Sequence, residues 1–240
     1  MKKYNIYSYQ NDLLFTDEII DNKIKVIENK DNYIHRTIVF NKINKKLKLI
    51  LIDELLFFLK KKKEHILVIG LGSESHTSDS VGPNTIKHIK VNAHLENLGI
   101  KLNRTKVSAL IPGVLGETGI LTEQTIKSIV KEIKPDYVIL IDSFVSNDIN
   151  YLNHTIEIND CGIMPGIGIK GLSSCINKET INVPILVIGV TTSILIRLSN
   201  NDKNFISYLL STKDIDEYVY NISKLIGECI NIAINKSQNM

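Results

Sequence analysis

The sequence predicts an α/β protein in which helices cover both faces of a mostly parallel sheet. Four short runs rich in isoleucine, valine and leucine lack polar alternation, which is typical of strands buried on both faces. These runs are residues 65–70, 106–113, 136–142 and 183–190. Stretches with helical periodicity lie before, between and after the runs. This alternation of strand and helix favours a three-layer sandwich with right-handed crossovers.

Four segments are expected to be helical. In chain order they are residues 46–62, 83–97, 122–134 and 212–235. Pro83 suits a first helical position, and Thr122 and Thr212 can each cap the helix that follows. Residues 1–42 carry weaker signals and are expected to form a flexible or hairpin-like extension. The sequence contains neither an obvious linker nor an internal repeat. We therefore expect residues 1–240 to form a single α/β domain.

Composition narrows the classes of partner and compartment. A formal charge of +3 is too small to indicate nucleic-acid binding, and the lysine runs at 45–48 and 60–63 fit solvated helix faces and ends. The apolar runs are shorter than a membrane span, and the N-terminus lacks the apolar stretch of a signal peptide. Three scattered cysteines do not form a disulfide framework. We therefore expect a reducing, cytoplasmic location and neither a nucleic-acid nor a membrane partner.

Two aspartates are expected at one edge of the sheet. Asp79 lies in the glycine-rich loop 70–83 after the first apolar run, and Asp142 ends the third. Binding sites in open parallel sheets form beyond the carboxyl ends of the strands. Two close, partly desolvated carboxylates share one proton, so one can activate water while the other donates to a carbonyl or leaving amine. The alternative is structural, with each aspartate capping a helix, as Asp79 would do near Pro83.

Other kinds of site match the sequence poorly. The Gly70-Leu71-Gly72 stretch begins like a dinucleotide loop, but Ser75 stands where the third glycine belongs. Neither a P-loop nor the GxSxG nucleophile pattern occurs. His88 and His94 are six residues apart on an expected helix, so they do not share a face as zinc ligands would.

Five segments, taken in order, resemble the germination protease family, the spore proteases that degrade small acid-soluble spore proteins. They read VIGLGSESHTSDSVGP (68–83), ALIPGVLGETGILT (109–122), IKPDYVILIDSF (133–144), NHTIEINDCGIMPGIGI (153–169) and VPILVIGVTT (183–192). The resemblance implies a sandwich similar in form to the hydrogenase-maturation proteases, a homotetramer, and a location in the forespore or spore core. It also implies a paired-aspartate endopeptidase that requires no metal or other cofactor. By motif position, the two aspartates are Asp79 and Asp142.

The N-terminus resembles the self-processing segment of the same family, whose members are made as zymogens. The stretch NDLLFTDE (11–18) is similar to the family's Thr-Asp-Leu-Ala context, so the matching bond joins Asp12 to Leu13. An ordinary N-terminal strand is the alternative interpretation of this stretch.

The chain also departs from the family pattern around the aspartates. Ser78 and Thr191 stand in place of prolines, Met164 in place of a histidine and Ile167 in place of a serine, and residues 170–177 lack a basic stretch. Two further hypotheses therefore stay open. One is a catalytically inactive relative that binds or regulates, and the other is a metal-dependent peptidase of the hydrogenase-maturation type.

Overall fold

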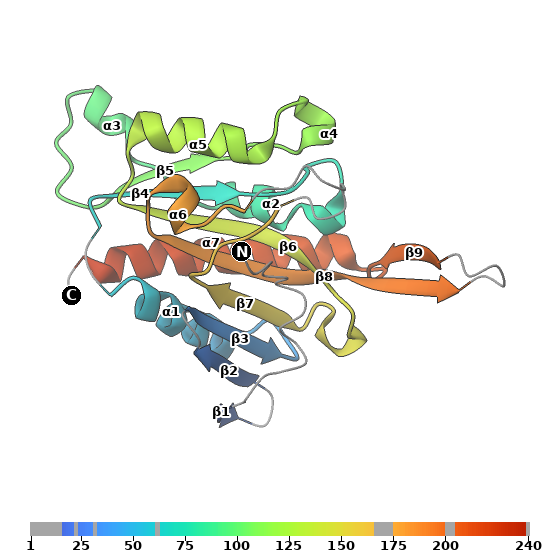
Figure 1. Cartoon of the computed structure of the whole chain (residues 1–240). Coiled ribbons are helices and arrows are strands. Elements are labelled where there is room, and N and C mark those ends of the chain that lie inside the picture. The colour runs from blue at the N-terminus through green and yellow to red at the C-terminus, as the bar shows by residue number, and fades with distance from the viewer. Residues whose placement is uncertain are drawn as a thin grey trace.

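One mixed sheet organises the molecule, with helices on both of its faces (Figure 1). The computed structural model describes residues 16–21, 24–30, 33–60, 63–165, 175–199 and 205–238. Within these residues the sheet has nine strands in the order β1-β2-β3-β7-β8-β6-β4-β5, with β9 paired to β8. The layered arrangement confirms the predicted α/β fold class, but the sheet is mixed and not mostly parallel, because antiparallel strands extend it.

The four apolar runs form the parallel part of the sheet, which ends at the edge strand β5. They correspond to β4 (His65–Gly70), β5 (Lys106–Leu110), β6 (Tyr137–Ser146) and β8 (Ile185–Ser199). β4 pairs in parallel with β5 on one side and β6 on the other, and β6 pairs in parallel with β8. Because helices cover both faces of these strands, their side chains have no polar face to present.

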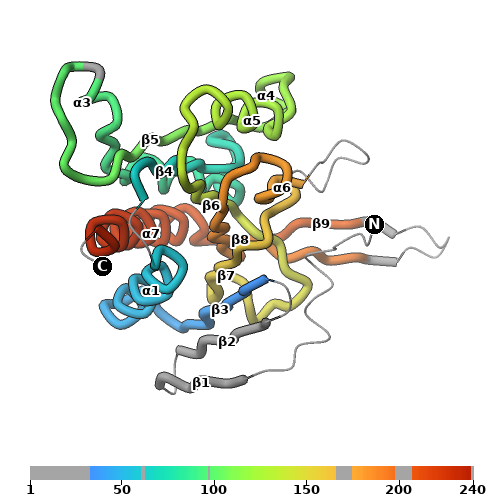
Figure 2. Tube along the Cα trace, turned by 60° about the vertical axis from the view of Figure 1, so that its left-hand side comes forward, coloured from blue at the N-terminus to red at the C-terminus, as the bar shows by residue number. Residues whose placement is uncertain are grey.

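Two hydrophobic clusters lie on opposite faces of the sheet. On one face, α1 (Lys45–Phe58), α2 (Val81–Ile86) and α7 (Ile215–Ser237) pack over the strands. On the other face lie α5 (Thr122–Ile133) and α6 (Lys178–Ile181). Figure 2 shows α1 and α7 side by side on their face, with α5 and α6 across the sheet from them.

The N-terminal part of the chain extends the sheet. β1 (Thr16–Asp21), β2 (Ile24–Lys30) and β3 (Ile34–Phe40) form an antiparallel meander, and β3 pairs with β7 (Thr155–Asn159). The hairpin-like expectation is therefore confirmed for these strands. A flexible extension is wrong for β3, because Ile38 and Phe40 are fully buried in the core.

A single helix over 83–97 is wrong. α2 ends at Ile86, and a short α3 (His94–Asn97) follows after a break. The break exists because Asn92 joins the edge of β5. Its side chain accepts the Val107 N–H at 2.7 Å and donates to the Thr105 carbonyl at 3.0 Å, and its own N–H donates to the Val107 carbonyl.

The predicted helix caps are also wrong, although the helices exist. The N-cap of α5 is Leu121, and the Thr122 hydroxyl instead donates to the Gly113 carbonyl at 3.1 Å. The N-cap of α7 is Asp214, and Thr212 accepts a hydrogen bond from the Asn153 side chain. Both threonine side chains therefore form hydrogen bonds with neighbouring loops instead of capping the helices.

The remaining elements lie mainly at the carboxyl ends of the central strands. They are η2 (Thr77–Asp79), α4 (Leu115–Thr118), η3 (Ile149–Tyr151) and β9 (Phe205–Leu210). β8 runs beyond β6 and pairs with β9 as an arm that projects from the body (Figure 1). None of the helices in the described part of the chain is long and apolar enough to span a membrane.

Candidate active site

The chain changes the direction in which it adds strands to the sheet between β4 and β6, and this place is the topological switch point of the fold. After β4 the chain continues to β5 on one side, and after β5 it returns across β4 to form β6 on the other side. α2, which follows β4, and α5, which follows β5, lie on opposite faces of the sheet. Ligand sites in open α/β sheets form at the carboxyl ends of the strands that flank such a point. Asp79 and Asp142 come from these two strands.

The loop after β4 folds back so that Asp79 lies over Gly72. The Ser73 N–H donates to the Asp79 carboxylate at 3.0 Å and to the Asp79 carbonyl at 3.1 Å. Gly72 has a φ of +107°, and a Cβ at this position would lie 1.9 Å from the Asp79 carbonyl oxygen. Only glycine fits this turn, both because of its backbone conformation and because of the close approach.

Asp142 lies on β6 just beyond the end of β4. The last pair between these strands joins Gly70 to Ile141, and the Leu71 N–H then donates to the Ile141 carbonyl at 2.8 Å. Asp142 is half-buried, and its carboxylate accepts the N–H of the next residue, Ser143, at 2.8 Å.

Hydroxyl groups and close backbone packing hold the two aspartate-bearing segments together. The Ser143 hydroxyl accepts the N–H of Val81, two residues after Asp79, at 3.3 Å. Gly82 packs so closely that a Cβ there would lie 2.6 Å from the Ile141 carbonyl. On the other flank, the Thr192 hydroxyl donates to the Ser78 carbonyl at 2.6 Å. Asp79 is thus held between β4, β6 and β8.

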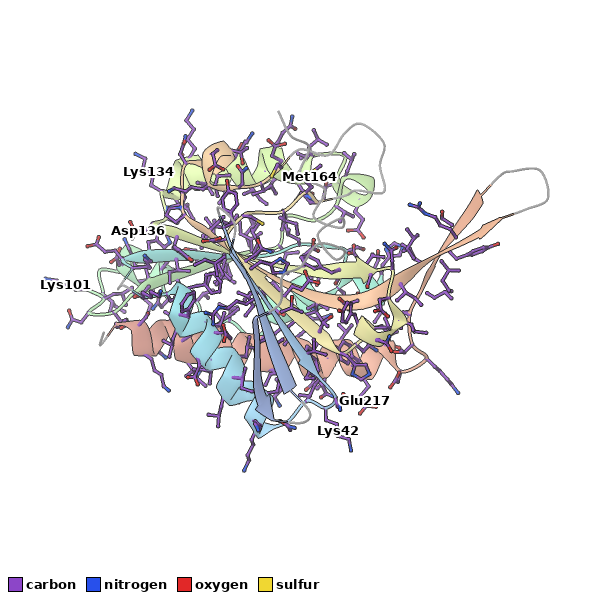
Figure 3. All side chains as sticks on the ribbon, turned by 60° about the horizontal axis from the view of Figure 1, so that its bottom comes forward. Lys42, Lys101, Lys134, Asp136, Met164 and Glu217 are labelled. Carbon is purple, nitrogen blue, oxygen red and sulfur yellow. The ribbon has the colours of Figure 1, made fainter. Side chains whose placement is uncertain are left out.

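The helix-capping interpretation of the aspartates is wrong. The N-cap of α2 is Ser80, and no side chain caps this helix. The Asp79 carboxylate accepts instead from Ser73, and Asp142 is a strand residue. Asp136 shows the contrasting structural role, since it accepts the N–H groups of Glu64 and His65 at the start of β6. In Figure 3 it lies at the end of the molecule away from the β8–β9 arm.

Burial and nearby charges shift the pKa of each carboxyl group of the pair by a different amount. Burial, and next the negative charge of Asp79, raise the pKa of Asp142 to about 8, against a smaller opposing effect of the Ser143 hydrogen bond. Burial also raises the pKa of Asp79, while the hydrogen bond from Ser73 and the nearby His76 lower it. At pH 7 the arrangement therefore favours a protonated Asp142 beside an ionised Asp79.

A third carboxylate lies next to the pair and was not predicted from the sequence. Glu117 of α4 accepts hydrogen bonds on Oε1 from the hydroxyls of Ser73 and Ser75, the latter at 2.6 Å. His76 Nδ1 lies 3.0 Å from the Ser73 hydroxyl and 3.1 Å from that of Ser75. In the sequence, Glu117 could have been noticed because it lies in the loop after residues 106–113, the apolar run whose strand pairs with β4.

The contacts of this cluster favour Glu117, and not His76, as the acceptor of the serine protons, and the Ser73 and Ser75 hydroxyls lie 2.8 Å from each other. A carboxylate only accepts, so both hydroxyl protons point to Glu117. With both protons directed to Glu117, His76 Nδ1 is left to donate to the serine oxygens. Among the described residues, no group of three or more His, Cys, Asp or Glu side chains is placed to hold a metal ion.

Several residues that the sequence analysis named lie away from the aspartate pair or outside the residues that the structure describes. Asp12, Leu13 and Ile167 are not among the described residues, nor is most of the 170–177 segment. Met164, labelled in Figure 3, is half-buried. It follows Ile163, which bridges to Ile176. The hydroxyl of Thr191 accepts a buried hydrogen bond from Thr155 at 2.8 Å.

Comparison with known proteins identifies the family. A family model described as germination protease matches residues 22–212, which is most of the chain. The chain belongs to the germination protease family. The match includes both aspartates, Glu117 and every strand from β2 to β9.

Individual germination proteases match this chain over stretches of different length. The Clostridium tetani protein is 32% identical over 211 residues, covering 70% of this chain and 65% of the relative. The Geobacillus sp. (strain WCH70) protein is 40% identical over 142 residues, covering 56% and 38%. The Caldanaerobacter subterraneus protein is 42% identical over 135 residues, covering 55% and 42%. The matched part of the chain thus spans between about two fifths and two thirds of these germination proteases.

A search of solved structures finds the [NiFe] hydrogenase maturation protease HycI from Thermococcus kodakarensis. It aligns with a TM-score of 0.40 and 15% identity over 75% of this chain and 98% of that one.

Proposed function

We propose that this chain is an endopeptidase that hydrolyses small acid-soluble spore proteins during germination, with Asp79 and Asp142 as its catalytic pair. Membership of the germination protease family supports the substrate class. The observation that carries the mechanism is the raised pKa of Asp142, to which the charge of Asp79 contributes. Two acids from neighbouring strand ends, one of which raises the pKa of the other, form an acid–base pair.

The protonation states assign a role to each aspartate. Ionised Asp79 takes a proton from water as the water oxygen attacks the carbonyl carbon of the scissile amide. Protonated Asp142 hydrogen-bonds the carbonyl oxygen as negative charge develops there, and its proton passes to the leaving amine when the C–N bond breaks. The products are a carboxylic acid and an amine. The pair returns to its starting state when Asp79 passes its proton to Asp142.

Cleavage of a purified spore protein tests this proposal. The wild-type protein should cut a small acid-soluble spore protein into fragments that mass spectrometry identifies. Asp79→Asn and Asp142→Asn should each lower the rate by about 10²–10⁴-fold, the usual contribution of a general acid or base. Asp53→Asn is the matched control, because Asp53 is exposed on α1.

Three outcomes separate the proposal from its alternatives. Wild-type protein that binds the substrate without cutting it indicates an inactive relative. Cleavage that a chelator abolishes and a divalent metal restores indicates a metal-dependent peptidase. An Asp142→Asn variant with wild-type turnover removes Asp142 from the mechanism.

We further propose, from family membership, a homotetramer in the forespore or spore core that is activated by cleavage of the Asp12–Leu13 bond. Mass spectrometry of active protein tests the processing step, since an N-terminus at Leu13 is expected. Active protein that retains Met1 contradicts it.

A further inference from the structure

We propose that Glu117 is a positioning residue for Asp79, which it holds in place through Ser73. Glu117 comes from the loop after β5, whereas Ser73 and Asp79 come from the loop after β4. The assignment rests on the proposed function, because it gives Glu117 a part in the same hydrolysis. It adds a third carboxylate to the site without making that carboxylate a proton carrier.

Ser73 is the physical link between the two acids. It is 2% exposed, and its hydroxyl donates to Glu117 while its backbone N–H donates to the Asp79 carboxylate. A hydrogen bond at the side chain and one at the main chain of the same buried residue leave little freedom for either partner. Movement of Glu117 would therefore be transmitted to the N–H that orients the Asp79 carboxylate.

The Ser73 hydroxyl has no spare hydrogen-bonding capacity. It donates its proton to Glu117 and accepts from the Ser75 N–H at 3.2 Å and from His76 Nδ1 at 3.0 Å, and the Ser75 hydroxyl lies 2.8 Å from it. One donor and two lone pairs are thereby used. The network requires an ionised Glu117, and the hydrogen bonds from Ser73 and Ser75 lower the pKa of Glu117 accordingly.

Glu117 also acts on Asp79 through charge. Its negative charge contributes to the raised pKa of Asp79, in opposition to His76. A higher pKa makes Asp79 a stronger base for water, provided that it stays ionised at the working pH. Loss of the Glu117 charge should therefore move the ionisation of Asp79 to lower pH and weaken it as a base.

The kinetic experiment compares Glu117→Gln, Ser73→Ala and a control, Glu74→Gln, on the spore-protein substrate. Glu74 is an exposed acid of the same loop, and it pairs with Lys87 at 3.1 Å and not with the serines. We expect Glu117→Gln and Ser73→Ala to lower kcat about 10-fold with KM unchanged, as misplacement of a catalytic group does. The acid limb of the pH–rate profile should move to lower pH in Glu117→Gln, and Glu74→Gln should match the wild type.

Other results would overturn the assignment. A raised KM with normal kcat in Glu117→Gln means that Glu117 binds substrate. A profile in Glu117→Gln that matches both the wild type and Glu74→Gln means that Glu117 has no role in catalysis. A fall in kcat that is accompanied by a lower melting temperature and an unchanged acid limb means that Glu117 only stabilises the loop.

A second measurement keeps this inference separate from the proposed function. The pKa of Asp79 can be followed by carbon NMR of its labelled carboxyl group, with no substrate present. A changed Asp79 pKa in Glu117→Gln supports the link even if the protein proves inactive: it falls where the lost charge of Glu117 dominates and rises where the Ser73 N–H moves away from the carboxylate. An unchanged value overturns the link even if cleavage is observed.

Discussion

At the scale of single residues, Asp142 shows how the fold supplies an acid that is protonated near neutral pH. Burial and the charge of Asp79 together raise the pKa of Asp142 to about 8. The same charge interaction couples the titration of the two aspartates.

The pH dependence of cleavage should follow from this coupling. We expect kcat/KM to fall on the alkaline side as Asp142 loses its proton, with a midpoint at pH about 8. On the acid side it should fall where Asp79 becomes protonated, at a higher pH than for an ordinary aspartate because the pKa of Asp79 is raised. Rates measured from pH 4 to pH 10 give both limbs. A rate that keeps rising through pH 9 contradicts the role of Asp142 as the acid.

The raised pKa of Asp142 also has a consequence for stability. An acid whose pKa is higher in the folded state stabilises the fold fully below its unfolded pKa, and this contribution is lost as the pH rises toward the folded pKa. The window for Asp142 therefore extends from pH about 4 to pH about 8. Asparagine cannot ionise, so Asp142→Asn should lack this loss.

We expect the stability of Asp142→Asn relative to the wild type to increase between pH 5 and pH 8. The gain should be about 2 kcal/mol, well below the full linkage value because the side chain is only half-buried. Urea unfolding at the two pH values measures it, with Asp53→Asn as the exposed control. A stability difference that is the same at both pH values excludes the ionisation of Asp142 as its cause.

At the scale of elements, the loop after β4 depends on a single glycine. In Gly72→Ala the new Cβ would collide with the Asp79 carbonyl in a backbone conformation that alanine avoids. Asp79 must then move, and we expect a loss of about 10²-fold in kcat with the fold retained, since a displacement of about 1 Å has such an effect.

Gly116→Ala is the matched control for this glycine. No atom lies within 4 Å of a Cβ placed there, and Gly116 has no positive φ. Peptidase assays and circular dichroism on both variants test the comparison. Normal activity of Gly72→Ala shows that the loop adapts and that its turn does not determine the position of Asp79.

The elements also show which parts of the fold the sequence can predict. The central strands and the long helices were predicted because burial on two faces or on one stripe leaves a periodic pattern. β7 was missed as a strand, and the pairing of β3 with it was not predicted, because this pairing joins residues far apart in the chain, such as Ile38 and Ile156. The break after α2 depends on Asn92 meeting β5, a contact that no local pattern records.

The candidate site also has residues that could be predicted from the sequence and residues that could not. Asp79 and Asp142 were predictable because strand ends of a parallel sheet share an edge, whatever the details of the loops. Glu117 was not, since its role depends on two hydroxyls that reach it across neighbouring loops. The choice of acid and base depends on burial, which only the folded structure defines.

At the scale of the whole molecule, the N-terminal strands and the strands next to the two aspartates belong to one sheet. β3 pairs with β7, β7 pairs with β8, and β8 pairs with β6, which carries Asp142. Phe40 at the end of β3 is 1% exposed and packs edge-on against His154, with ring centroids 6.5 Å apart. The Phe40 N–H also donates to the His154 carbonyl at 2.8 Å.

We therefore expect Phe40→Ala to destabilise the whole sheet and not only its edge. The free energy of unfolding should fall by about 3 kcal/mol, the usual loss for a buried phenylalanine, and unfolding should remain a single transition seen equally by fluorescence and circular dichroism. Leu98→Ala, at a side chain that is 71% exposed, should change it little. If Phe40→Ala instead produces an early transition that leaves peptidase activity intact, the N-terminal strands form a separate unit. In that case β3 does not support the β6–β8 pair on which the site is built.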